Sequence, residues 1–118
     1  MTETNVIDER AFSELFASVG GDTAFLGELI DTYFNDATEL LATMHRALPD
    51  GKAEEFRRAA HSLKSNSANL GAMRLSALAK ELEMMGKAGV LDGAADKIAQ
   101  AESEYAQVKV ALEQKRAQ

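Results

Sequence analysis

Apolar residues recur at steps of three and four positions along almost the whole chain, and no segment shows the sustained alternation of a β-strand. Such spacing places the apolar side chains on one face of a helix, which has about 3.6 residues per turn. The pattern therefore predicts a short helix followed by four long ones, over residues 8–19, 23–47, 52–70, 73–87 and 93–114.

Residues that favour turns separate the predicted helices. Asp22 is a suitable N-cap for the second helix, and Pro49 ends it, because the residue before a proline is pushed out of the α region. Gly71 separates the third helix from the fourth, and Asp92 is a candidate N-cap for the last. Because the connections are short, neighbouring long helices should run antiparallel. We predict an all-α, up-down-up-down four-helix bundle over residues 1–118, a single domain with the short first helix covering one end.

Composition narrows the class of protein. The chain has 118 residues and a formal net charge of −6. It contains no cysteine, which excludes disulfides and thiolate metal sites. A nucleic-acid-binding protein would need a basic face to displace counterions from phosphates, and the acidic balance argues against one. Residues 1–10 are polar and acidic, and no apolar run approaches a membrane span, so neither a secretory signal nor a membrane protein is expected. A cytoplasmic protein is the simplest interpretation.

The third predicted helix contains His61, the residue with the clearest chemical potential. The core positions of this helix form one stripe, made of Phe56, Ala59, Ala60, Leu63, Ser67 and Leu70. His61 lies roughly 140° from the centre of that stripe when the helix is counted at about 100° per residue. We therefore expect its ring to face solvent. A lone histidine is more often a packed core residue, and the position on the helix argues against that alternative.

The exposed face around His61 carries cations and small residues, namely Arg57, Arg58, Lys64, Ser65 and Ala68. An ordinary solvated face is the alternative explanation of the cations taken alone. The combination favours an exposed, nucleophilic imidazole in a setting for an anion. Free imidazole has a pKa of about 6.5, so it is nucleophilic near neutral pH and can form a covalent phosphoramidate. Nearby cations would offset the phosphoryl charge of roughly −1.5 to −2, and Lys64 is best placed to do so.

The segment from Ala60 to Ala72, AHSLKSNSANLGA, resembles the signature of the histidine-containing phosphotransfer (HPt) domain family. That signature reads His-x-Leu-Lys-Gly, followed by small residues and a glycine. The resemblance extends over nearly the whole chain. It includes the entry to the second helix, the helix lengths and the Leu-x-x-Glu-Leu-Glu pattern from Leu78 to Glu83.

The resemblance implies an intermediate of a multi-step phosphorelay. His61 would take a phosphoryl group on Nε2 from an aspartyl phosphate of a response-regulator receiver domain and pass it to another receiver, with Lys64 supporting the phosphate. In that family Mg²⁺ belongs to the receiver, so no cofactor is expected in this chain. Receivers are the implied partners, a hybrid histidine kinase is a further candidate, and we expect a monomer. The chain has no ATP-binding signature, so it is not expected to be a kinase on its own.

Ser65 and Glu83 are two further positions that bear on the chemistry of His61. Ser65 stands where the family usually has glycine; serine is still small, so transfer rate and partner choice are more affected than the activity itself. Glu83 stands where the family often has Gln or Glu near the imidazole. We hypothesise that its carboxylate accepts the Nδ1–H of His61 and leaves Nε2 free to attack. An ordinary solvated glutamate is the competing interpretation.

A second stripe on the second predicted helix includes Phe25, Leu29 and Thr32. It is offset from the predicted core positions of that helix, which are Leu26, Ile30, Tyr33, Ala37, Leu40 and Met44. By resemblance, this stripe would flank His61 and form, with the exposed neighbours of His61, the docking surface for a receiver. Plain core packing of Phe25 and Leu29 is the alternative.

The remaining candidate residues have simpler interpretations. We expect His45 to be a cation favoured by the helix dipole at the end of the second helix. Met84 and Met85 face either the core or a partner, and core filling is the favoured interpretation. Carboxylate metal sites of bundles need Glu-x-x-His pairs, and neither histidine has a glutamate three residues before it, so no metal site is predicted. The alternative function is a bundle that binds receiver or kinase domains without phosphotransfer. The presence of both His61 and Lys64 favours transfer.

Overall fold

The computed structural model describes residues 6–117, which form helices joined by turns. In chain order the helices are α1 (Glu9–Ser18), α2 (Thr23–Ala47), α3 (Ala53–Asn69), α4 (Met73–Ala88) and α5 (Ala94–Arg116). The predicted all-α class is confirmed. The predicted helix ends differ from the observed ones by at most two residues.

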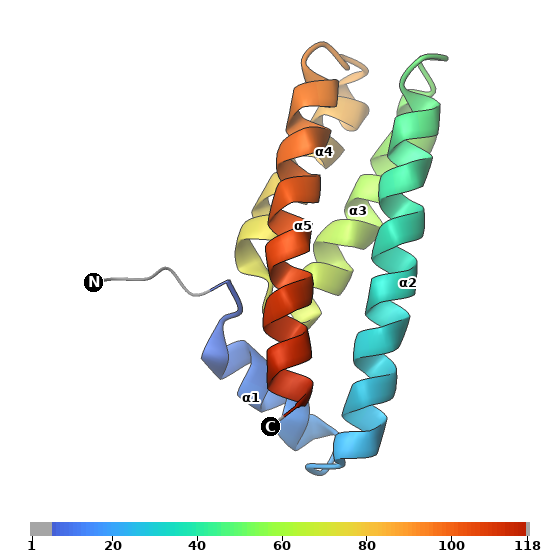
Figure 1. Cartoon of the computed structure of the whole chain (residues 1–118). Coiled ribbons are helices and arrows are strands. Elements are labelled where there is room, and N and C mark those ends of the chain that lie inside the picture. The colour runs from blue at the N-terminus through green and yellow to red at the C-terminus, as the bar shows by residue number, and fades with distance from the viewer. Residues whose placement is uncertain (1–5, 118) are drawn as a thin grey trace, which may run out of the picture.

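The four long helices run side by side in alternating directions, and α1 lies across the end of the bundle where α2 begins and α5 ends (Figure 1). Packing contacts join α2 to α3, α3 to α4, α4 to α5 and α5 back to α2. This closed cycle of neighbours confirms the predicted up-down-up-down bundle with a short additional N-terminal helix. It also places the middle of α3 between α2 and α4.

Side chains and glycines define the helix ends. Asp22 is the N-cap of α2, as predicted, and its Oδ1 accepts the Phe25 N–H at 3.0 Å. The prediction of Asp92 as the cap of α5 is wrong. Gly93 occupies the N-cap position in the left-handed conformation, with φ of 81°, and no side chain caps this end. Glycine adopts that conformation without a Cβ clash, so the turn ends one residue later than expected.

The core lies along the bundle axis and contains the whole predicted stripe of α3, from Phe56 to Leu70. On α2 one predicted position is wrong, since Leu40 is half-buried and Leu41 is buried. A helical period of 3.6 residues allows a step of three or four after Ala37, and packing against the neighbouring helices selects four. The buried Ser67 hydroxyl forms a hydrogen bond of 2.8 Å with the Tyr33 hydroxyl, which satisfies both polar groups inside the core.

Helices α3 and α4 approach closely at Gly86. A Cβ atom on Gly86 would lie only 2.9 Å from Cα and from Cβ of Arg57, which is too short for an unstrained contact. One turn from this contact along each antiparallel helix lie His61 on α3 and Glu83 on α4. The glycine therefore brings the two helices close enough for side chains at that level to meet.

Candidate functional site

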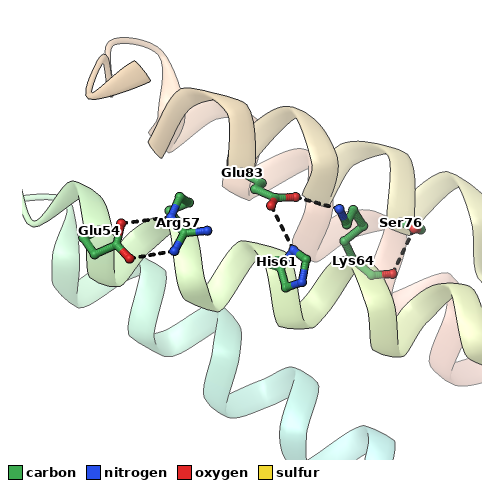
Figure 2. A network of polar contacts seen from close by, with 6 residues as sticks. All are labelled: Glu54, Arg57, His61, Lys64, Ser76 and Glu83. Carbon is green, nitrogen blue, oxygen red and sulfur yellow. Dashed lines mark hydrogen bonds and ion pairs between the residues drawn. The ribbon is translucent and has the colours of Figure 1, made fainter. Parts of the chain in front are cut away.

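His61 lies in the middle of α3, on the face opposite to the core stripe, and its side chain is 53% exposed. Its neighbours Ala60 and Leu63 are fully buried, whereas His61 faces away from the core, as the helical period predicts. The imidazole contacts Glu83 of α4 (Figure 2).

Glu83 of α4 fixes the orientation of the ring. Its Oε2 lies 2.9 Å from Nδ1 of His61. Because a carboxylate only accepts hydrogen bonds, the proton of this contact belongs to Nδ1. The neutral ring then carries its lone pair on Nε2, for which the described residues provide no hydrogen-bond partner.

Lys64 completes the site one turn after His61. Its Nζ lies 2.8 Å from Oε1 of Glu83, so the two oxygens of one carboxylate bind the imidazole and the ammonium group separately. The Lys64 hydrogen bond is the main cause that lowers the pKa of Glu83, and the His61 hydrogen bond lowers it further against the opposing effect of burial. Glu83 is therefore ionised at neutral pH.

Ser76 supports this arrangement from the backbone side. Its hydroxyl donates to the carbonyl oxygen of Lys64 at 2.9 Å (Figure 2). This bond ties the C-terminal half of α3 to the first turn of α4. The backbone of Lys64 is thereby held at a fixed distance from the helix that carries Glu83.

The two arginines before His61 contact Glu54 rather than the imidazole. Arg57 donates from Nε and Nη2 to the two oxygens of Glu54 at 2.9 and 2.6 Å, and this bond is the main cause that lowers the pKa of Glu54. Arg58 lies 3.7 Å from the same carboxylate and is 72% exposed. Both arginines belong to the face of α3 that was predicted to be exposed. The Arg57 side chain is less exposed than its place on the helix predicts, because α4 covers part of it.

A groove of about 560 Å³ lies where α1, α2, the C-terminal part of α3 and the start of α4 meet. Three of the predicted docking residues, Leu29, Thr32 and Ala68, line this groove together. Phe25 is exposed and Ser65 is exposed, and neither lines it. The exposure of Phe25, at 45%, is inconsistent with the alternative of plain core packing for that residue.

The family model of the Hpt domain matches residues 28–115, which include the whole site. The chain belongs to the Hpt domain family. Its fold is similar to the crystal structure of histidine-containing phosphotransfer protein B (HptB) from Pseudomonas aeruginosa PAO1, with a TM-score of 0.88 and 34% sequence identity over 98% of this chain and 97% of that chain. No curated protein matches the sequence. The family assignment predicted from the segment around His61 is confirmed.

His45 lies in the last turn of α2, as predicted, and its Nε2 also contacts Oε2 of Glu102 on α5 at 2.7 Å. Another prediction for this Hpt domain is wrong, since Met84 is 52% exposed and does not fill the core, whereas Met85 packs against it. The packing of the neighbouring helices decides which of the two methionines is covered, and the pattern of one helix does not contain that information.

Sequence reasoning missed several residues that shape the site of this Hpt domain. Gly86 and Ser76 fix the contact between α3 and α4. Leu15 of α1 and Met73 of α4 form walls of the groove. A glycine inside a helical pattern was an available signal, because it costs about 1 kcal/mol relative to alanine and often marks close packing.

Neither a metal site nor a membrane-spanning helix is found within residues 6–117. No group of three or more histidine, aspartate or glutamate side chains converges there in a way that would hold a metal ion. In the same range, no helix combines the length and apolar character needed to cross a membrane.

Proposed function

We propose that this Hpt domain carries a phosphoryl group on Nε2 of His61 and relays it between aspartates of receiver domains. The observation that carries the proposal is the exposed imidazole whose Nδ1 is bound by the ionised Glu83, which leaves Nε2 open. Membership of the Hpt family supports it, as does the similarity to a protein named for histidine-containing phosphotransfer.

The transfer is a displacement at phosphorus. The lone pair of Nε2 forms the N–P bond while the bond between phosphorus and the aspartyl oxygen of the receiver breaks, and the carboxylate leaves with the electron pair. The ring gains positive charge, which the carboxylate of Glu83 stabilises through Nδ1–H. Lys64 offsets charge on the phosphoryl group. The reverse step gives the group to the next aspartate, and Mg²⁺ is expected only in the receiver.

The docking surface proposed for the receiver extends from His61 to the groove. Leu29, Thr32 and Ala68 supply small and apolar contacts within the groove. Ser65, which is exposed beside His61, is small enough to let a receiver approach the ring. Arg58 and Phe25 are both exposed and are further candidates for this surface. A hybrid histidine kinase that contains a receiver would dock in the same way.

Incubation with phosphorylated receiver domains and Mg²⁺ tests the proposal. The wild-type chain should acquire an acid-labile, base-stable phosphoryl group, and His61→Gln should abolish it. His45→Gln is the matched control, because His45 is similarly exposed and also contacts a glutamate; its labelling should equal that of the wild type. Stable binding of receivers without transfer, over a broad panel, would instead support an adaptor.

A further inference from the structure

The carboxylate of Glu83 is shared between two groups with different tasks. Its Oε2 lies 2.9 Å from Nδ1 of His61, and its Oε1 lies 2.8 Å from Nζ of Lys64. The Glu83 side chain is only 15% exposed, so these charge-assisted contacts are partly shielded from water. In the unphosphorylated protein, the ammonium group of Lys64 is therefore already bound to an anion.

Phosphorylation of His61 introduces a second anion within reach of Lys64. The phosphoryl group would carry about −1.5 to −2 charge, against −1 for the carboxylate. Lys64 follows His61 by three residues and lies on the same face of α3, so its flexible side chain reaches the ring region. Nε2 and Nδ1 point away from each other on the imidazole, so one ammonium group cannot keep its best contact with both anions.

We propose, building on the proposed function, that phosphorylation of His61 moves Nζ of Lys64 from Glu83 to the phosphoryl oxygens. Glu83 is then a positioning residue that competes with the phosphoryl group for Lys64. No covalent bond changes in this exchange beyond the transfer itself: the ion pair with Oε1 opens, and a contact with a phosphoryl oxygen forms. The Nδ1–H contact with Oε2 is kept.

The exchange limits how strongly Lys64 stabilises phospho-His61. Opening the Lys64–Glu83 ion pair offsets part of the favourable interaction between Lys64 and the phosphoryl group. The phosphohistidine consequently keeps its capacity to give the group away, which a relay intermediate needs. With a neutral residue in place of Glu83, Lys64 would have no competing anion in the site.

A double-mutant cycle on the phosphotransfer equilibrium tests this exchange. The equilibrium constant between a receiver aspartyl phosphate and phospho-His61 is measured for the wild type, Lys64→Met, Glu83→Gln and the double variant. Lys64→Met should lower the constant in both backgrounds. The factor should be roughly two- to fivefold larger in the Glu83→Gln background, which is the range expected for losing a partly exposed ion pair.

The cycle isolates the Lys64–Glu83 term, because direct effects of Glu83 on the ring and the phosphoryl group cancel between the two backgrounds. Glutamine retains an oxygen that accepts Nδ1–H, so ¹⁵N NMR should show the same tautomer of His61 in Glu83→Gln. Lys97→Met and Glu81→Gln form the matched control cycle, since this Lys–Glu pair also joins α4 to a neighbouring helix. In this control cycle, Lys97→Met should change the equilibrium constant by the same factor with and without Glu81→Gln.

Equal factors for Lys64→Met in the two backgrounds would overturn the exchange, since Lys64 would then bind both anions at once. An unchanged constant for Lys64→Met in the wild-type background would overturn it too, since Lys64 would then stay with Glu83. A smaller factor in the Glu83→Gln background would overturn it as well. These outcomes differ from failure of the proposed function, in which the wild-type chain itself accepts no phosphoryl group from any receiver.

Discussion

The two histidines of this chain have similar exposure and similar partners. His61 on α3 and His45 on α2 are 53% and 51% exposed, and each contacts a glutamate of a neighbouring helix at 2.9 and 2.7 Å. They differ in the nitrogen that is bound. Glu83 contacts Nδ1 of His61, whereas Glu102 contacts Nε2 of His45, so only His61 has its Nε2 open.

The two glutamates also differ in how firmly they are held. Glu83 is 15% exposed and is bound by Lys64 as well, whereas Glu102 is 44% exposed. A shielded carboxylate with two partners keeps one position, whereas an exposed one loses its contact to water more readily. The two histidines therefore differ in the nitrogen that is bound and in how firmly its partner is held, although their exposure is alike.

The largest difference between the two sites is expected when each glutamate is truncated. Glu83→Ala should slow phosphoryl transfer to His61 by about tenfold to 100-fold, the range for losing a hydrogen bond to a charged group. Glu102→Ala should leave that rate unchanged, because its partner is His45. Stopped transfer reactions with a phosphorylated receiver measure both rates.

NMR of the ring nitrogens shows whether slower transfer in Glu83→Ala comes from a changed tautomer of His61 or from a general loss of structure. In Glu83→Ala the imidazole of His61 should populate both tautomers, while that of His45 stays as in the wild type. Unchanged transfer and an unchanged tautomer in Glu83→Ala would refute the orienting role of Glu83.

The next largest effect is on the free energy of unfolding, through the packing of α4 against α3 and of α5 against α2. Gly86→Ala places a Cβ against the backbone of Arg57 at 2.9 Å, and it should lower the free energy of unfolding by about 1–2 kcal/mol in spite of the better helix propensity of alanine. Gly27→Ala is the matched control between α2 and α5. Its Cβ would meet the flexible end of Arg116 at 3.2 Å, so a change of only about 0.5 kcal/mol is expected.

Denaturant titrations of the two glycine variants give both free energies. The overpacked Gly86→Ala should also weaken the contact of Glu83 with His61, since the same helix pair holds both residues. An increase in stability for Gly86→Ala would contradict the close packing of α3 and α4.

The smallest effect is the dependence of stability on pH. The pKa of Glu83 is lowered, mainly by Lys64, so the ionised carboxyl stabilises the fold at neutral pH, and this contribution is lost as the pH falls through the lowered pKa. Glu83→Gln should therefore cost at most about 1 kcal/mol near pH 7, and the difference from the wild type should vanish in acid.

Asp31 provides the exposed counterpart on the other side of the bundle. Its pKa is also lowered by a hydrogen bond, from Arg116, but its side chain is 62% exposed. Asp31→Asn should thus show the same direction with pH, a smaller size and a stronger loss in salt. A pH-independent difference between Glu83→Gln and the wild type would contradict the assigned cause.

The helical period of the sequence predicted correctly which face of α3 is buried. It placed His61 opposite to the core stripe, and the structure shows the ring half-exposed with that whole stripe buried. The same reasoning failed for Met84 and for Leu40. Those positions lie at the edge of an apolar face, where the neighbouring helix decides which side chain is covered.

By itself, the sequence determined the helices, their order and antiparallel direction, the exposed face of His61 and the family. These follow from local spacing and from short connections, which leave few ways to pack. Only the tertiary structure decided which nitrogen of His61 is bound, that Lys64 shares the carboxylate of Glu83, and which of the predicted docking residues line one groove. Those features depend on the distance and rotation between α3 and its neighbours. The close contact between Gly86 and Arg57 helps to set the distance between α3 and α4.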